Sequence, residues 1–153
     1  MSEIRNLPPY RDSIAGSLLA AREATMAPIR PLLRTANFTE QQWRVLRVLS
    51  DEGPLDVASL AEKTMLHGPS VTRILKELGD RGLAARELDK ADRRRSIVDI
   101  TRAGREAIDD TASHTLQLIN RYVEAFGRER LSALLAELAA FQEALAPFAP
   151  DPD

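Results

Sequence analysis

The stretch from Asp56 to Gly104 limits most strongly what this chain can fold into. It holds two short segments with helical spacing, a glycine-ended turn, and the charged run Asp89-Lys90-Ala91-Asp92-Arg93-Arg94-Arg95 between two strand-like segments. A winged helix-turn-helix needs these parts in this order, because one helix fills the major groove of DNA and a basic hairpin reaches the neighbouring minor groove. The stretch therefore predicts a DNA-binding unit.

The net charge of −2 argues at first sight against a nucleic-acid ligand, but the charge is unevenly distributed. Residues 70–105 hold ten basic and six acidic residues, a net +4, whereas residues 106–153 hold three and nine, a net −6. Residues 1–69 balance, with eight of each sign. Phosphate binding depends on the local field, so the basic middle of the chain is compatible with DNA.

The length of 153 residues fits one compact domain with an added dimerisation surface. The absence of cysteine excludes disulfides, thiolate zinc sites and cysteine-based redox sensing. The start of the chain is polar and signal-free, and no uninterrupted run of about 18 apolar residues occurs, so we expect a cytoplasmic protein without a spanning helix or a membrane partner.

The sequence offers little support for an enzyme. Acidic pairs such as Asp109 and Asp110 lie on a polar helix face or, like Asp89 and Asp92, in a charged loop. Neither a nucleophile with a base, nor a glycine-rich phosphate loop, nor histidines at metal-ligand spacing accompanies them. We therefore expect no catalytic residue, no metal and no cofactor.

Apolar spacing, caps and breakers predict a mainly α-helical chain with a small β-hairpin. The predicted helices cover 13–33 with a kink near Ala27, 39–50, 57–64, Pro69 to Gly79 or Gly82, 101–126, and a last one after Gly127; the strands cover 83–87 and 96–100. As one continuous domain, the chain then has an N-terminal dimerisation helix in 1–36, a winged helix-turn-helix in 37–105 and C-terminal dimerisation helices in 106–153.

The helix that follows Gly68 has two distinct faces. Four apolar residues share its inner face at 3.6-residue spacing: Val71, Ile74, Leu75 and Leu78. Its start and outer face offer hydrogen-bond donors and small groups, as a helix in the major groove requires. We predict DNA contacts from six residues: Gly68, Pro69, Ser70, Thr72, Arg73 and Lys76.

The charged run supplies four more predicted DNA contacts: Asp92, Arg93, Arg94 and Arg95. Arg94 is the favoured minor-groove arginine, with Asp92 expected to fix its guanidinium by a bidentate pair. The alternative is that the run is a solvated loop without a ligand, which is the usual fate of an isolated arginine triplet.

Two motifs carry a family resemblance. Asp92-Arg93-Arg94 is followed by Ile100-Thr101-Arg102-Ala103-Gly104, and Ser70-Val71-Thr72-Arg73-Ile74-Leu75 precedes them. From about Ser13 to Phe148 the chain resembles the MarR family of bacterial transcription regulators, which shows Asp-x-Arg and then Leu-Thr-x-x-Gly. Ile100 replaces the usual leucine. Residues 20–26 and 39–46 resemble the subgroup that regulates homoprotocatechuate (hydroxyphenylacetate) degradation operons.

The resemblance implies a homodimeric repressor that binds a pseudo-palindromic operator in double-stranded DNA. It also implies release from DNA when a small phenolic or aromatic carboxylate binds between the dimerisation and DNA-binding parts. The dimer has independent support, because the terminal helices carry more apolar surface than a small core can cover.

Arg22 is the least expected residue of the first helix, since it falls within the apolar stripe. It either forms an ion pair within the protein or binds the effector's carboxylate. The other predicted effector residues are Met26, Trp43, Arg47, Met65 and Leu66, although a tryptophan in this position is more often part of the core. Two alternatives stay open: a constitutive DNA-binding regulator without an effector, and a helical protein-interaction module.

Overall fold

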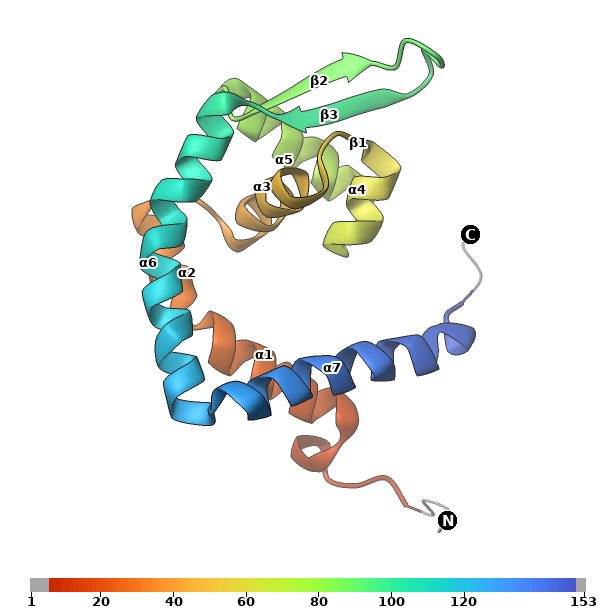
Figure 1. Ribbon diagram of the computed structural model, residues 1–153. Helices are drawn as coiled ribbons and strands as arrows, with labels where there is room; N and C mark the ends of the chain where they lie inside the picture. Colours follow the sequence, from red (N-terminus) through yellow and green to blue (C-terminus); the bar gives the residue numbers. More distant parts are fainter. Residues whose placement is uncertain (1–5, 151–153) are drawn as a thin grey trace. The chain divides into compact units, whose positions relative to one another are not determined.

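The computed structural model describes residues 6–150 (Figure 1). The residues form two compact units, one up to Thr115 and one from Leu116 onward, and the division falls inside a helix. In chain order the elements are η1 (Tyr10–Asp12), α1 (Ile14–Met26), α2 (Ile29–Thr35), α3 (Glu40–Glu52), β1 (Leu55–Asp56), α4 (Val57–Thr64), α5 (Gly68–Asp80), β2 (Ala84–Leu88), β3 (Ser96–Ile100), α6 (Arg102–Phe126), α7 (Arg128–Leu145) and η2 (Ala146–Phe148).

Caps and breakers end the helices close to the predicted positions. α1 ends and α2 begins on either side of Pro28, which confirms the expected kink. Thr39 and Gln42 form the expected capping box, each donating its amide to the other's side chain at 3.1 Å. Gly127, with a φ of 98°, separates α6 from α7. α3 continues to Glu52, slightly beyond its predicted end.

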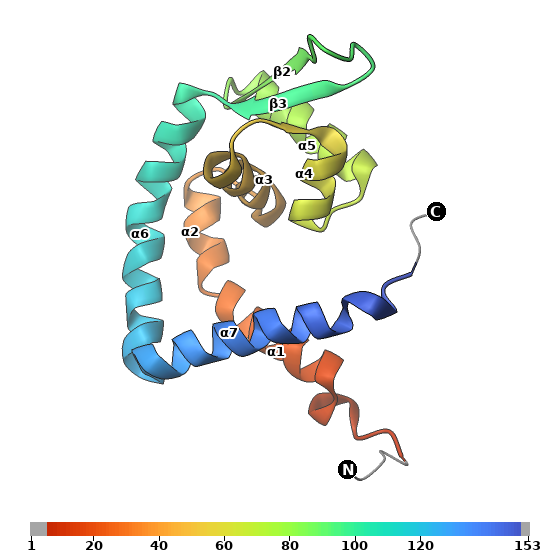
Figure 2. The ribbon, with the colours of Figure 1, turned by 45° about the vertical axis from the view of Figure 1, so that its right-hand side comes forward.

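The helix-turn-helix consists of α4 and α5, packed with α3 around one core (Figure 2). The inner face of α5 is buried at all four predicted positions, which confirms the orientation of this helix. Val45, Leu46 and Leu49 of α3 and Leu60 of α4 are completely buried against it. Because this core fixes the inner face of α5, its polar face is left on the outside.

The wing is a three-stranded antiparallel sheet in the order β1-β3-β2. Ala84 pairs with Ile100 and Leu88 with Ser96 in the predicted hairpin. β1 was not predicted, because two residues are too short to show alternation; its Asp56 pairs with Ile97 of β3. This extra strand joins the hairpin directly to the N-cap residue of α4.

The Thr101–Gly104 motif joins the hairpin to α6 through backbone atoms. The Thr101 amide donates to Leu83 O at 3.1 Å, and Thr101 Oγ1 donates to Gly82 O at 2.6 Å and accepts from the Gly104 amide at 3.0 Å. A Cβ at Gly104 would lie 2.2 Å from Leu83 O, so only glycine allows this approach. The signature found in the sequence is therefore a packing junction.

The apolar stripe of α1 is largely exposed in the described chain. Gly16 is the only buried residue of α1, whereas Ile14 and Leu18 are 63% and 41% exposed. The sequence predicts that α1 is a dimerisation helix, and the described part of one chain leaves its stripe uncovered.

The second unit also leaves apolar side chains uncovered. α7 has no buried residue, and seven large apolar residues of α7 and η2 are at least partly exposed: Leu131, Leu134, Leu135, Leu138, Phe141, Leu145 and Phe148. An 18-residue window within Arg128–Phe148 has a mean hydropathy of 1.2, so by length and composition this segment could cross a membrane. The sequence-based argument against a membrane-spanning helix is therefore not conclusive. A single helix of this kind that contains Glu137 and Glu143 is only weak evidence for a membrane span.

Candidate functional site

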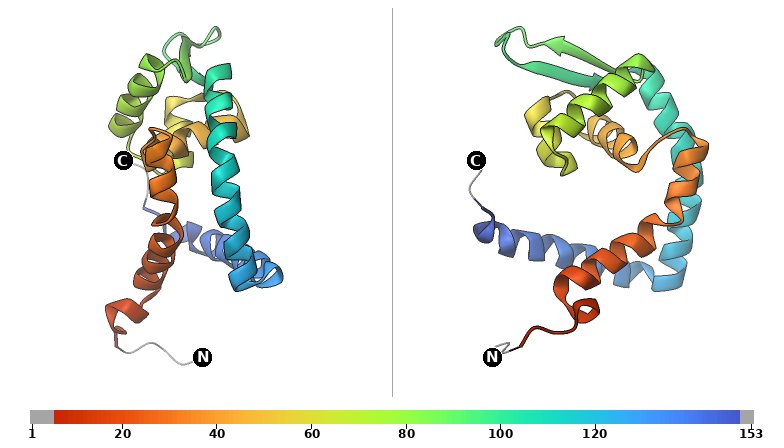
Figure 3. Two further views of the ribbon diagram at one scale, coloured as in Figure 1. Left: turned by 90° about the vertical axis from the view of Figure 1, so that its left-hand side faces the viewer. Right: turned by 180° about the vertical axis from the view of Figure 1, so that it is seen from behind.

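The outer face of α5 lies open to solvent. Seen from behind, α5 lies in front of α3 and α4 (Figure 3, right). Of the six residues predicted there, Ser70 is half-buried and Gly68, Pro69, Thr72, Arg73 and Lys76 are exposed. The structure thus brings the predicted contacts of α5 together on one accessible helix face.

The two cations of this face are held by acidic residues of the same helix. Arg73 pairs with Glu77, and Lys76 with Asp80, each at 2.9 Å and one turn apart. The hydrogen bond that Lys76 donates to Asp80 raises the pKa of Lys76. Exposed pairs of this kind are worth a few tenths of a kcal/mol, so a phosphate or a guanine edge can displace them at little cost.

The first turn of α5 carries amides without helical partners. His67 occupies the N-cap position but its side chain forms no capping hydrogen bond. The first helical bond runs from the Val71 amide to His67 O at 3.0 Å. The preceding amides of Gly68 and Ser70 can therefore donate to an anion.

The wing loop is ordered by its two aspartates. Asp89 Oδ1 accepts from the Ala91 amide at 2.9 Å, and Asp92 Oδ1 accepts from the Arg94 amide at 3.0 Å. The predicted bidentate pair between Asp92 and the Arg94 guanidinium is not formed. The prediction was wrong because a short aspartate side chain bonds the backbone two residues ahead more readily than it reaches an arginine head group.

The arginines of the loop differ in what holds them. Within residues 6–150, neither Arg93 nor Arg94 forms an ion pair. Arg95 instead donates to Asp56, and this hydrogen bond raises the pKa of Arg95. A groove of about 470 Å³ lies between α4 and the wing, and Arg86, Arg94, Arg95, Ser59 and Glu62 are among its lining residues.

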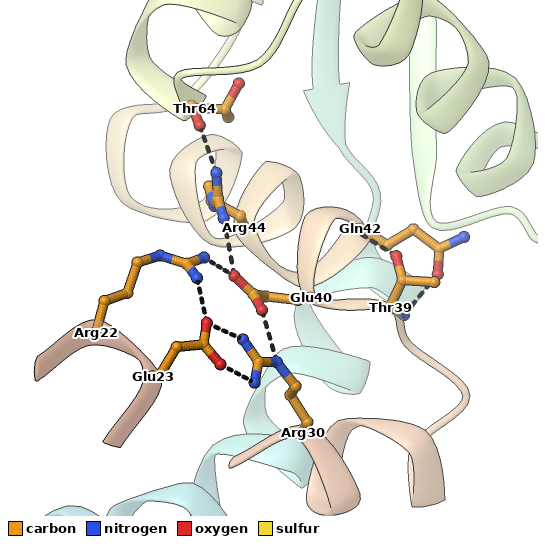
Figure 4. A network of polar contacts seen from close by, with 8 residues as sticks. All are labelled: Arg22, Glu23, Arg30, Thr39, Glu40, Gln42, Arg44 and Thr64. Atoms are coloured by element: carbon orange, nitrogen blue, oxygen red, sulfur yellow. Dashed lines mark hydrogen bonds and ion pairs between the residues drawn. The ribbon is translucent and has the colours of Figure 1, made fainter. Parts of the chain in front are cut away.

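A second charged site joins α1, α2 and α3 (Figure 4). We call it the ion-pair cluster; it consists of Arg22, Glu23, Arg30, Glu40 and Arg44. Glu40 accepts from Arg22, from Arg30 Nε at 3.0 Å and from Arg44 at 2.9 Å. Glu23 accepts both terminal nitrogens of Arg30 at 2.8 Å. Three guanidiniums face two carboxylates, so the cluster has one excess positive charge.

The charges of the cluster stabilise one another. The hydrogen bond from Arg30 lowers the pKa of Glu23. Burial raises the pKa of Glu40, but the hydrogen bond from Arg30 and the charge of Arg22 outweigh it, so that the pKa is lowered overall. Hydrogen bonds to Glu23 and Glu40 raise the pKa of Arg30. Both carboxylates therefore stay ionised at neutral pH.

Arg22 forms ion pairs with carboxylates of its own chain, which is the first of the two alternatives derived from the sequence. Its partners Glu23 and Glu40 were not singled out in the sequence, nor were Arg30 and Arg44. The seven-residue spacing between Glu23 and Arg30 was a usable signal. Glu40 lies 18 residues from Arg22, and the packing of α1 against α2 and of α2 against α3 brings them together.

The other predicted effector residues differ in burial. Trp43 is 7% exposed and packs on Phe38, with ring centroids 5.9 Å apart, so it belongs to the core. The Arg47 guanidinium lies 5.9 Å from the Trp43 ring. Met26 and Leu66 are half-buried, whereas Met65 is 87% exposed. In the described range 6–150, no three His, Asp or Glu side chains are placed to hold a metal ion.

Comparison with known proteins tests this arrangement. Residues 36–95, which include α3, α4, α5, the strands β1 and β2 and the wing loop, match the model of the MarR family. The chain is 38% identical over 136 residues to the HTH-type transcriptional regulator FarR of Neisseria gonorrhoeae, covering 87% of this chain and 93% of that protein. The chain belongs to the MarR family. It is thus a DNA-binding transcriptional regulator rather than an enzyme.

Two further relatives concern aromatic acids. The chain is 34% identical over 131 residues to the homoprotocatechuate degradative operon repressor of Escherichia coli, covering 85% and 88% of the two chains. The crystal structure of NadR in complex with 4-hydroxyphenylacetate superposes with a TM-score of 0.79 at 34% identity, covering 89% of this chain and 96% of that one. The mainly helical winged helix-turn-helix predicted from the sequence is confirmed.

Proposed function

We propose that this MarR-family regulator is a cytoplasmic homodimeric repressor of an aromatic-compound catabolic operon, and that a small aromatic carboxylate releases it from its operator. The observation that carries the proposal is the 34% identity, over most of both chains, to NadR, whose structure holds 4-hydroxyphenylacetate. The similarity to a homoprotocatechuate operon repressor supports the same class of effector.

We assign the DNA contacts to the outer face of α5 and to the wing tip. Support comes from the exposed donors Thr72, Arg73 and Lys76 on α5, and from Arg93 and Arg94, which no carboxylate neutralises in the described chain. α5 reads base edges in the major groove, and an arginine of the wing enters the adjacent minor groove. In a two-fold symmetric dimer the two half-sites lie about one helical turn apart, roughly 34 Å.

The dimer is proposed from the uncovered apolar side chains of α1 and α7. Leu135 is 59% exposed. Burying such residues against a second copy removes apolar surface from water at about 25 cal/mol per Å². Light scattering after size-exclusion chromatography tests this step: Leu135→Glu should shift the mass toward the monomer, whereas Gln142→Glu on the same helix should not. Equal masses for wild type and Leu135→Glu would contradict this use of α7.

Residues around the ion-pair cluster and Trp43 form the proposed effector region, from the set Arg22, Met26, Trp43, Arg47, Met65 and Leu66. The excess positive charge of the cluster suits a carboxylate. An incoming carboxylate competes with Glu40 for guanidiniums on α1, α2 and α3, so it changes the contacts between these helices. Such a ligand lowers operator affinity only if it favours an arrangement of the recognition helices that fits DNA poorly.

Fluorescence anisotropy with a duplex from the chain's own upstream region tests the proposal. Addition of 4-hydroxyphenylacetate should release the duplex, whereas the neutral 4-hydroxyphenylacetamide should not, because it lacks the charge that the guanidiniums recognise. Arg22→Ala should keep operator binding and blunt the release. Unchanged binding at saturating levels of several aromatic acids would favour the constitutive regulator instead.

A further inference from the structure

Arg95 differs from Arg93 and Arg94 of the wing loop, because its side chain forms an ion pair with Asp56 at the start of the helix-turn-helix. Asp56 of β1 lies opposite Ile97 of β3, two residues from Arg95. Residues two apart on a strand share a face, so Asp56 and Arg95 are diagonal neighbours within reach of a long side chain. The Arg95 guanidinium donates to Asp56 Oδ2. The pair therefore follows from the register of the short strand β1.

Asp56 holds two elements with its two oxygens. Oδ1 accepts from the Ser59 amide at 2.7 Å and caps α4, while Oδ2 accepts from Arg95. The Asp56 side chain is only 16% exposed. The Ser59 amide and then the Arg95 guanidinium lower the pKa of Asp56, so its charge is present at neutral pH.

Arg95 also closes the wing loop with its backbone. Its amide donates to Asp92 O, and its carbonyl accepts from the Asp89 amide, both at 2.9 Å. One residue thus ends the loop on one side and reaches α4 on the other. The basic tip, with Arg93 and Arg94, is thereby connected to the helix-turn-helix at the wing base.

Release of Arg95 toward a phosphate would have an electrostatic cost. The Asp56 carboxylate would stay in the groove next to Glu62 with Ser59 as its remaining donor, and its charge would face the DNA. A largely buried charge that loses its partner is unfavourable. Keeping the pair intact neutralises Asp56 and leaves Arg93 and Arg94 for the DNA.

We propose that Arg95 and Asp56 form a clamp that fixes the wing base to the start of α4, so that Arg95 is a positioning residue and does not contact DNA. The inference rests on the proposed DNA site at α5 and the wing tip. It removes Arg95 from the contacts predicted from the sequence. A consequence of the clamp is that the acidic residue Asp56 strengthens DNA binding, because a wing tip that is already held in place loses less conformational entropy when it enters the minor groove.

The decisive variant is Asp56→Ser, since serine keeps the helix cap but removes the partner of Arg95. If the clamp exists, operator affinity should fall about fivefold in Asp56→Ser and in Arg95→Met. The double variant should lose no more affinity than either single variant. The slope of log affinity against log salt should stay at the wild-type value in all three, while Arg94→Ala lowers it. Without a clamp, Asp56→Ser should bind DNA more tightly, because a negative charge near phosphate is gone.

A second readout needs no DNA. The sequence has no cysteine, so Ala91→Cys at the wing tip can carry a single nitroxide label. Asp56→Ser and Arg95→Met should both increase the label's mobility, with urea midpoints close to the wild type. Unchanged mobility, or a salt slope lowered by Arg95→Met as much as by Arg94→Ala, would overturn the clamp. If the label responds but the wild type binds no duplex, the proposed DNA site fails and the clamp stands as a structural contact.

Discussion

Replacement of Gly104 by alanine should destabilise the fold by about 2–4 kcal/mol. The added Cβ would lie 2.2 Å from Leu83 O and 2.6 Å from Ile100 Cγ1. Leu83 O is a backbone atom held by the Thr101 amide, so it cannot rotate away as a side chain could. The start of α6 must therefore move from the hairpin by roughly 1 Å to restore van der Waals contact.

The magnitude follows from what that movement disturbs. The hydrogen bonds from Thr101 to Gly82 O and Leu83 O are each worth about 1 kcal/mol. Strain from an added methyl in a packed junction contributes about 1–3 kcal/mol more, part of which is relieved as the bonds lengthen. For a chain of this size the loss corresponds to a fall in melting temperature of roughly 4–15 °C.

Gly79→Ala is the matched control. The nearest atom to its added Cβ is Ala84 O at 3.8 Å, an ordinary contact, and Gly79 lies inside α5. Because alanine is the better helix former, this variant should be neutral or more stable by up to about 1 kcal/mol. Urea unfolding followed by circular dichroism compares the two. Equal midpoints for both variants would refute the account of the junction.

Three further predictions follow from the site and the core. Arg94→Ala should weaken operator binding and lower the salt slope by about one per subunit, which anisotropy at several salt concentrations measures; an unchanged slope would remove Arg94 from the DNA contacts. The pKa values of Glu23 and Glu40 are lowered from 4.5, so the stabilisation from the ion-pair cluster is complete above that pH and is lost as the pH falls toward the lowered values. Urea midpoints at stepped pH test this, and Glu40→Gln should flatten the acid limb. Leu46→Ala should cost about 2–5 kcal/mol in urea unfolding because Leu46 is fully buried, whereas Leu88→Ala, at an exposed position of β2, should change stability by less than about 0.5 kcal/mol.

Local signals in the sequence predicted most of the fold. The capping box at Thr39, the break at Pro28 and the glycine at 127 act within a few residues, so their effects can be read along the chain. β1 was missed because its two residues gain strand geometry only from pairing with β3. The spacing of apolar residues in α1 likewise does not say what covers them, since burial depends on the partner of a helix and not on its own sequence.

The site was predicted less completely than the fold. The basic residues of α5 and the wing stand out because charge and helical phase are local. The partners of those residues are not: Arg95 meets Asp56, 39 residues away, and Arg22 meets Glu40 through tertiary packing. The expected ion pair between Asp92 and the Arg94 guanidinium does not form, because the Asp92 carboxylate accepts the backbone amide of Arg94 instead. Sequence spacing alone locates the charged groups, whereas the choice of partner for each depends on tertiary packing.

At the junction of Thr101 and Gly104, the hydrogen bonds from Thr101 go to the backbone carbonyl oxygens of residues 82 and 83. Every amino acid has such a carbonyl oxygen. Mutations on the outer face of the preceding helix or along the hairpin tip can thus accumulate without loosening the frame that carries them. Such a frame lets operator preference drift during evolution while the architecture persists.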